Sequence, residues 1–358
     1  MTVVVNCRFL TRPVTGVERY AMEMVEALAG IRSDLTLVAP PKPELHRTEL
    51  AGLPVQRVGI HSGHAWEQFT LPRHLRGIGV PLLLDLANSG PVWYRNQVVV
   101  VHDVTHRRHP GAHSRAFRRW YALMTPLLMR RARAVVTVSE FSKGEIRELY
   151  SRDDVAVTPN AVGAWVTGRQ SPPTSAESLE DTPFFLIVGS RAAHKDLATA
   201  YDAFARYREG GGNALLAVVG SSHPSLADGR PDADRIPDAV VDFGRVSDEE
   251  LAWLYGRACA FIFPTRYEGF GIPPVEAQTA GTPVIVSDIP VLREVLTEGS
   301  ALRFAPGDAV ALARAMVEVG DPGVAARLVE AGRANAARYS WSVSASTLSG
   351  IIDGLNRD

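Results

Sequence analysis

The sequence predicts an α/β protein built from two Rossmann-like, doubly wound domains. Three observations support this fold class. The chain has 358 residues, 46% of them hydrophobic, which is too long for one ordinary α/β core and suits two. Short apolar runs alternate with amphipathic segments, as in parallel sheets with crossover helices. Near the middle of the chain, a stretch rich in Pro and Ser without hydrophobic periodicity interrupts this alternation.

The first domain is expected to cover residues 1–168. Its predicted strands are short apolar runs, mostly rich in β-branched residues. They lie at residues 3–5, 35–38, 55–58, 82–84, 98–101, 134–138 and 155–158. Amphipathic helices are predicted between strands, notably at residues 17–28, 115–131 and 140–150. The Pro- and Ser-rich residues 169–183 are the expected linker.

The second domain is expected at residues 184–340. Its predicted strands lie at residues 184–188, 215–219, 240–243, 259–263 and 284–286. Ser247 and Glu250 form a capping box that opens a helix reaching Tyr255. The remaining residues, 341–358, contain an apolar-periodic helix from Trp341 to Leu355.

Composition excludes several classes of protein. The formal net charge of −1 gives no general case for nucleic-acid binding. No run of about 18 apolar residues could span a membrane, and the first residues indicate a strand, so a cytoplasmic protein is expected. Cys7 and Cys259 lie in apolar runs and are expected to be buried thiols without a disulfide. No Cys/His spacing typical of a metal site is present.

The most informative motif is the stretch from Glu268 to Glu276, which reads Glu-Gly-Phe-Gly-Ile-Pro-Pro-Val-Glu. It lies between a predicted buried strand and a short helix that Gly281 ends. A helix amino terminus after a glycine loop presents free N–H groups to a phosphate. Because prolines 273 and 274 lack an N–H, the donors left are chiefly the amides of Phe270, Gly271 and Ile272.

Carboxylates at both ends of this motif suit hydroxyl groups, because an ionised carboxylate only accepts hydrogen bonds. Glu268 and Glu276 therefore predict a site for a sugar nucleotide, with hydroxyls on both sides of a diphosphate. The alternative is a plain helix cap with two solvated glutamates.

Residues 268–286 resemble the signature of the family 4 (group 1) retaining glycosyltransferases, and the resemblance extends over almost the whole chain. It implies the GT-B fold, in which two domains face across a cleft and the final helix returns to the first domain. It also implies metal-independent transfer of a hexose or deoxyhexose, such as mannose or rhamnose, from a nucleotide diphosphate sugar to an acceptor hydroxyl. The nucleoside diphosphate of the donor could be GDP, UDP or dTDP. No further cofactor is expected. Polysaccharide biosynthesis is the expected context.

A second strand-to-helix loop carries Gly189, Arg191 and Lys195. Ligands bind at the carboxyl ends of strands in open α/β sheets, and cations there stabilise a leaving diphosphate. The resemblance assigns Arg191 and Lys195 to the donor diphosphate and the turn at Val246 to the base. Two solvated surface cations are the alternative.

In the first domain, the resemblance places the loop at Gly16 over the diphosphate and gives His102, which follows a buried strand, a contact with the donor sugar or acceptor. A structural histidine is the alternative. The Gly16 loop opens a helix, where glycine permits close backbone approach. Because no G-x-G-x-x-G fingerprint occurs in the chain, a dinucleotide oxidoreductase is disfavoured.

Two further features concern the acceptor. Between Val104 and Ser139 the chain has eight arginines and no acidic residue, so residues 107–133 are a candidate for peripheral contact with an anionic membrane. A solvated helix face explains the same arginines. Residues 63–68, Gly-His-Ala-Trp-Glu-Gln, also occur in relatives that modify polysaccharide or lipid-linked chains.

Three rival functions remain open. One is a sugar-nucleotide epimerase with the same fold, and another is a catalytically silent sugar-nucleotide-binding protein. A pyridoxal-phosphate phosphorylase would need a buried Schiff-base lysine, which Lys195 in a polar loop does not suit.

Overall fold

The computed structural model describes residues 2–112, 114–174, 176–220 and 237–355. The chain forms two compact units: unit 1 comprises Met1–Val104, Arg119–Asn160 and Ser340–Asp358, and unit 2 comprises Thr105–Arg118 and Ala161–Tyr339. Thr105–Arg118 of the expected first domain thus belong to unit 2, and the later border falls at Asn160, before the expected end of that domain. Residues 164–167 pack against helix α9 of unit 2 (Asp248–Arg257), which explains this position.

Within its described residues, unit 1 contains an eight-stranded sheet in the order β3-β4-β2-β1-β5-β6-β7-β8. Every strand pair is parallel except the β3–β4 hairpin at the edge. The strands are β1 (Val3–Asn6), β2 (Leu35–Ala39), β3 (Glu49–Leu50), β4 (Leu53–Arg57), β5 (Leu82–Asp85), β6 (Gln97–Val100), β7 (Ala134–Thr137) and β8 (Val155–Val157). The sequence predicted all of these within a few residues, apart from β3.

The helices of unit 1 follow the predicted crossover pattern. They are α1 (Gly16–Ala29), α2 (Gly63–Ala65), α3 (Leu71–Gly77), most of α5 (Arg115–Arg131), α6 (Glu140–Tyr150) and α14 (Trp341–Leu355). A π-helical turn, Trp66–Thr70, joins α2 to α3. Strand order reverses between β1 and β5, so the carboxyl ends of these two strands mark the switch point where open α/β sheets bind ligands.

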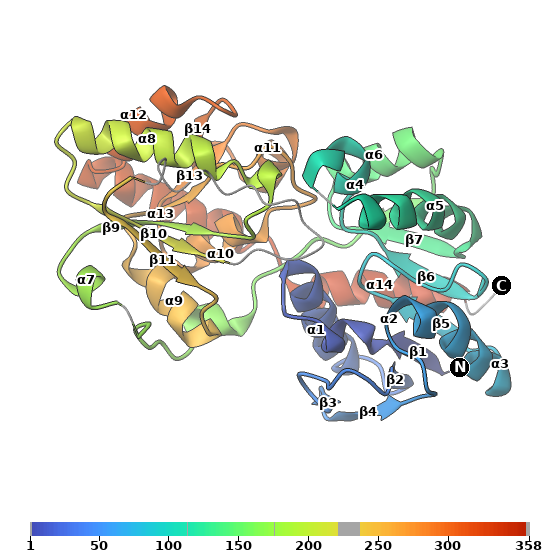
Figure 1. Ribbon diagram of the computed structural model, residues 1–358. Helices are drawn as coiled ribbons and strands as arrows, with labels where there is room; N and C mark the ends of the chain where they lie inside the picture. Colours follow the sequence, from blue (N-terminus) through green and yellow to red (C-terminus); the bar gives the residue numbers. More distant parts are fainter. Residues whose placement is uncertain (1, 113, 175, 221–236, 356–358) are drawn as a thin grey trace. The chain divides into compact units, whose positions relative to one another are not determined.

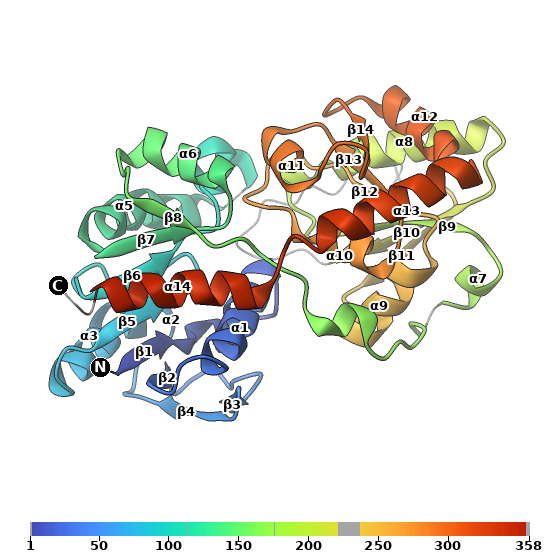
Figure 2. The same cartoon turned by 180° about the vertical axis from the view of Figure 1, so that it is seen from behind.

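The C-terminal helix returns to unit 1, as the resemblance implied. Figure 2 shows α14 lying beside α1. The rings of Tyr20 and Trp341 meet edge to face with centroids 5.4 Å apart. The Ser344 hydroxyl donates to the Pro159 carbonyl at 2.8 Å. Ala345, Leu348 and Ile352 of α14 are buried.

The described part of unit 2 contains a six-stranded parallel sheet in the order β11-β10-β9-β12-β13-β14. Its strands are β9 (Phe184–Val188), β10 (Leu215–Val219), β11 (Val240–Gly244), β12 (Ala260–Phe263), β13 (Val284–Ser287) and β14 (Leu302–Phe304). Its helices are α4 (Thr105–Arg108), α7 (Glu177–Glu180), α8 (Leu197–Glu209), α9, α10 (Ile272–Ala280), α11 (Pro290–Val295), α12 (Ala309–Glu318) and α13 (Pro322–Ala336). Here the switch point lies between β9 and β12.

Helices cover both faces of this second sheet. In Figure 1, α8 and α12 lie on one side, and α9, α10 and α13 lie on the other. The first face buries Phe185 and Ile187 of β9 against Leu197 and Phe204 of α8. Alternation of side chains along each strand sends Phe184 and Leu186 to the opposite face. Both faces are therefore dry, as buried parallel sheets require.

The predicted capping box and the burial of Cys7 are confirmed, and one prediction, on Cys259, is wrong. The Ser247–Glu250 capping box is present, since the Ser247 N–H donates to Glu250 and the Glu250 N–H to the Ser247 hydroxyl. Cys7 is a buried free thiol, as expected. The expectation that Cys259 is buried was wrong, because this residue precedes β12 and is exposed.

Candidate functional site

The Glu268 loop of unit 2 connects β12 to the amino terminus of α10. Gly271 caps this helix with φ of +87°, a conformation that favours glycine, and a Cβ there would lie 2.8 Å from Leu292 Cδ2. The paired prolines fall in the first helical turn, as predicted. Phe270 is buried, with its ring edge to face against Tyr339 at 5.1 Å. The loop is therefore fixed by packing, with Ile272 as the first residue of the helix.

Glu276 lies one turn inside α10 and is only 4% exposed. The Tyr255 hydroxyl of α9 donates to its Oε2 atom at 3.0 Å. The backbone carbonyl of Tyr255 in turn accepts a hydrogen bond from the Thr282 hydroxyl. These bonds fix a carboxylate beside the amino terminus of α10, where it can accept hydrogen bonds from hydroxyl groups.

Lys195 and Glu268 meet at the switch point of unit 2. Lys195 Nζ lies 2.5 Å from Glu268 Oε1, and both side chains are mostly buried. The ammonium also lies 5.1 Å from the centre of the Phe263 ring. The structure thus brings together two predicted site residues from loops that follow different strands. The Lys195 ammonium and the Glu268 carboxylate neutralise each other.

Arg191 is held differently from the solvated cation that the sequence left open. Its side chain is 1% exposed, and Nη2 lies 2.5 Å from Asp242 Oδ1. Asp242 also accepts a hydrogen bond from the Gly244 N–H at 3.0 Å. Among the described residues, the Arg191 Nε atom has no partner. Arg191 therefore supplies a buried positive charge beside the loop that Gly189 opens.

Three glycines line the ends of β9, β10 and β11. They are Gly189, Gly220 and Gly244. A Cβ on Gly220 would lie 1.8 Å from the Gly189 carbonyl oxygen. The Gly220 N–H donates to the Gly244 carbonyl at 2.6 Å. Sequence reasoning missed Gly220, although a glycine directly after a predicted strand is a signal for close backbone approach. Val246, the predicted base contact, follows this layer and is half-buried.

His102 and Gly16 belong to unit 1. Gly16 is exposed as the first residue of α1. His102 is buried, its Nε2–H donates to the Leu86 carbonyl at 2.9 Å, and its ring meets Tyr20 of α1 edge to face at 4.6 Å. Burial lowers the pKa of His102. The imidazole is therefore neutral near pH 7, with Nδ1 as the nitrogen that carries a lone pair.

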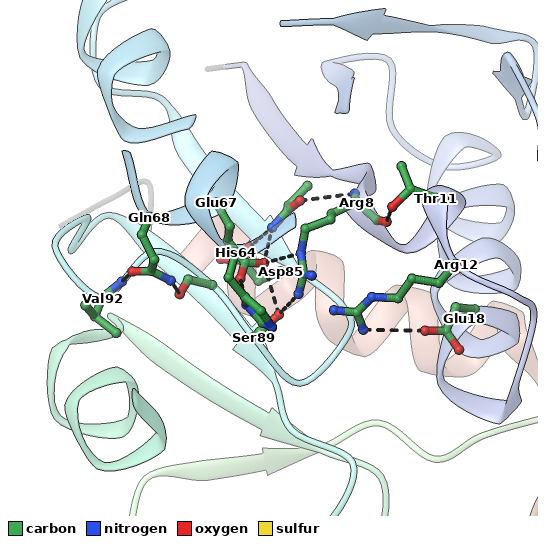
Figure 3. Close-up of polar contacts among 12 residues, drawn as sticks. Arg8, Thr11, Arg12, Glu18, His64, Glu67, Gln68, Asp85, Ser89 and Val92 are labelled. Atoms are coloured by element: carbon green, nitrogen blue, oxygen red, sulfur yellow. Dashed lines mark hydrogen bonds and ion pairs between the residues drawn. The ribbon is translucent and has the colours of Figure 1, made fainter. Parts of the chain in front are cut away.

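A buried polar cluster occupies the switch point of unit 1 (Figure 3). Arg8 Nε lies 3.0 Å from Glu67 Oε1, and Arg8 Nη2 donates to the Ser89 hydroxyl at 2.6 Å. Asn6 Nδ2 bridges Glu67 and Asp85 at 3.1 and 2.7 Å. Residues 63–68, which the sequence singled out, contribute Glu67, but the other members of this cluster were not predicted. Polar residues that end predicted strands, as Asn6 and Asp85 do, were the available signal.

The described residues contain neither a candidate metal site nor a candidate membrane-spanning helix. No group of three or more His, Cys, Asp or Glu side chains in this part of the chain could hold a metal ion. No helix there is long and apolar enough to cross a membrane.

Two family models match the chain. One, described as glycosyltransferase family 4, matches residues 14–164, and the other, described as glycosyl transferases group 1, matches residues 171–334.

Curated relatives include several mannosyltransferases. The O-antigen chain mannosyltransferase RfbU of Salmonella typhimurium is 32% identical over 60% of this chain, which spans 58% of that relative's length, little more than half. The O-antigen chain mannosyltransferase B of Escherichia coli is 25% identical over 92% of this chain and 93% of the relative. The GDP-mannose:cellobiosyl-diphosphopolyprenol alpha-mannosyltransferase of Komagataeibacter xylinus is 26% identical over 94% and 88%.

Solved structures share the whole fold. Sucrose-phosphate synthase from Thermosynechococcus elongatus superposes with a TM-score of 0.78 at 20% identity, with all of both chains covered. HepE of Anabaena, solved in complex with UDP and glucose, gives 0.74 at 15% identity over 99% of each chain.

Proposed function

The chain belongs to the group 1, family 4 glycosyltransferases, which have the GT-B fold, and on this premise we propose that it transfers mannose from GDP-mannose to a hydroxyl of a growing glycan. The Lys195–Glu268 pair beside the amino terminus of α10 is the observation that carries this proposal. It combines a cation for a diphosphate with a carboxylate for sugar hydroxyls. The mannosyltransferase relatives support the choice of sugar.

When the donor binds, Lys195 and Glu268 each exchange their ion-pair partner for a group of the donor. The diphosphate accepts hydrogen bonds from Lys195 and from the first amides of α10, while Arg191 adds buried positive charge. Lys195 thereby leaves Glu268, whose carboxylate then accepts hydrogen bonds from mannose hydroxyls. Glu276 accepts hydrogen bonds from the ribose. Because protein groups supply this positive charge, transfer is proposed to need no metal ion.

The reaction is proposed to retain the anomeric configuration. The bond between the anomeric carbon and the diphosphate oxygen breaks, and a bond from that carbon to the acceptor oxygen forms on the same face. The proton of the acceptor hydroxyl passes to the leaving phosphate oxygen, which becomes more basic as the bond breaks. His102, neutral in the folded protein, contacts the sugar or the acceptor through Nδ1.

A direct assay tests this function. The purified protein is incubated with GDP-mannose, UDP-glucose or dTDP-rhamnose, with and without octyl α-mannoside, in buffer containing EDTA. GDP release that requires the acceptor, with an α-linked product by NMR, is expected. Binding without turnover identifies a silent binding protein, and an altered sugar nucleotide formed without acceptor identifies an epimerase.

The arginine-rich segment is proposed to hold the protein at an anionic membrane that carries a lipid-linked acceptor. Its helix, α5, exposes Arg115, Arg118 and Arg119, which make no ion pair within the described residues. Leu123 on the same helix is 61% exposed. Basic residues with an exposed apolar side chain suit the surface of anionic lipid.

A further inference from the structure

The switch point of unit 1 carries a histidine–carboxylate pair that is not among the predicted site residues. Glu67 comes from the π-helical turn after α2, and His64 comes from α2 itself. π-Helical turns are frequent at functional sites. Asn6 and Asp85, at the carboxyl ends of β1 and β5, lie in contact in the same cluster. This is the position where an open α/β sheet binds its ligand.

The Glu67 carboxylate is buried and fixed. Its side chain is 1% exposed, and Oε1 accepts hydrogen bonds from Arg8 Nε at 3.0 Å, the Ser89 hydroxyl at 3.0 Å and Asn6 Nδ2 at 3.1 Å. Burial alone would raise the pKa of Glu67, but the Arg8 charge and the His64 hydrogen bond lower it to about 2. An ionised carboxylate held by three donors can orient another side chain.

His64 is the group that this carboxylate orients. Its Nδ1 atom lies 3.3 Å from Glu67 Oε2, so the Nδ1–H donates to the carboxylate. In the neutral form of an imidazole, a hydrogen bond donated by Nδ1 leaves the lone pair on Nε2. Within the described chain, Nε2 has no hydrogen-bond partner, and the side chain is 35% exposed. Figure 3 shows His64 beside Glu67.

Aromatic side chains restrict the His64 ring from the side of α5. The ring centroid lies 4.8 Å from that of Trp120 and 6.3 Å from that of Tyr121, with Tyr121 edge to face. The Tyr121 hydroxyl in turn bonds to Arg12, which is 30% exposed and pairs with Glu18. A half-exposed aromatic ring, a guanidinium and an oriented imidazole together suit a sugar ring, which stacks on the first and hydrogen bonds to the others.

We infer that His64, held by Glu67, is an acceptor-binding residue whose Nε2 atom accepts a hydrogen bond from a hydroxyl of the acceptor sugar. This inference rests on the proposed transferase function and assigns its acceptor side to a named side chain. Glu67 acts through His64 and is a positioning residue. Arg8, Asn6 and Ser89 keep the carboxylate in place.

Binding of octyl α-mannoside, followed by NMR of the histidine ring protons in the presence of GDP, tests the inference without requiring turnover. The His64 resonance, identified by its loss in His64→Ala, is expected to shift on titration. His74 of α3 also lies in unit 1 and serves as the internal reference, with no shift expected. If the His64 resonance does not move when octyl α-mannoside is added up to its solubility limit, the inference is overturned.

Kinetics separate acceptor binding from a structural effect. His64→Ala should raise the KM for octyl α-mannoside at least about fivefold, as expected for one lost hydrogen bond, while the Kd for GDP stays unchanged. His64→Gln, whose side-chain oxygen can accept a hydrogen bond near the Nε2 position, should recover part of the loss. Glu67→Gln should raise the KM by less than His64→Ala does. His74→Ala should match the wild type.

The two arms distinguish failure of the inference from failure of the proposed function. A His64 shift without any transfer by the wild type supports the acceptor contact and removes the proposed mannosyl transfer. Transfer by the wild type with an unchanged KM in His64→Ala overturns the contact and leaves the transferase assignment in place. If neither a His64 shift nor transfer is observed, both the acceptor contact and the proposed function are overturned.

Discussion

Lys195 and Glu268 are 73 positions apart in the chain, yet Lys195 Nζ lies 2.5 Å from Glu268 Oε1. The contact forms because β9 and β12 are neighbours in the sheet of unit 2, so the loops that follow them meet. Each partner neutralises the other in the free protein. The first two predictions follow from what a donor must do to this pair.

Replacing Lys195 by Ala should lower kcat by about 10²–10³, because one electrostatic donor to a leaving group is typically worth this much. Donor binding should weaken less, since other groups also contact the diphosphate. Steady-state kinetics with GDP-mannose measure both effects. Lys143→Ala is the matched control, because Lys143 forms an exposed pair with Glu140 on α6. Wild-type turnover in Lys195→Ala would remove this residue from the mechanism.

Glu268 and Glu276 should respond differently to substitution. Glu276→Gln should weaken binding of GDP alone, because the proposed ribose contact is lost. Glu268→Gln should bind GDP as well as the wild type or more tightly, because Lys195 no longer has a competing carboxylate. Calorimetry with GDP and no sugar measures both. The opposite ranking would reverse the two assignments.

Asp85 gives a prediction about pH. Burial, with the nearby Glu67 charge, raises the pKa of Asp85 well above its ordinary range. The unfolded chain loses this proton at about pH 4, whereas the folded protein keeps it. The free energy of unfolding should therefore fall as the pH rises from about 4 toward the folded-state pKa.

Asp85→Asn should remove most of this pH dependence. Asp85 Oδ2 and Gln97 Oε1 both lie close to Gly90, and each is a buried oxygen without a partner among the described residues. An amide nitrogen at the Oδ2 position could donate to Gln97, so the variant should be more stable than the wild type at pH 8 by about 1 kcal/mol. Urea unfolding at pH 5 and pH 8 measures this. Asp153→Asn, at an exposed pair with Arg147, should behave as the wild type.

Reversing Arg115, Arg118 and Arg119 to Glu should abolish binding to vesicles that contain anionic lipid, since each basic residue near such a surface is worth about 1 kcal/mol. Binding of GDP should not change. Sedimentation with the vesicles at low salt measures the first effect. A control with Arg257, Arg314 and Arg327 reversed, all exposed in unit 2, changes the net charge equally and should keep vesicle binding. Wild-type protein that remains in the supernatant would contradict the membrane proposal.

The sequence by itself determined the local elements and the donor loops. Helices Arg115–Arg131, Glu140–Tyr150 and Trp341–Leu355 have the predicted bounds, because hydrophobic periodicity and caps act over a few residues. Gly271 and Gly281 lie at the two ends of α10 because only glycine tolerates their backbone conformations without strain. The motif around Glu268 also identified the family.

Only the tertiary structure decided which charges meet. Strand order places Asn6 beside Asp85, and no local pattern encodes that order. Burial of Arg191 against Asp242 depends on β11 lying two strands from β9, and exposure of Cys259 depends on what covers the start of β12. The orientation of His64 by Glu67 requires Arg8 and Ser89 from distant segments to hold the carboxylate. Such contacts arise from long-range packing, whereas periodicity and caps report only the conformation of neighbouring residues.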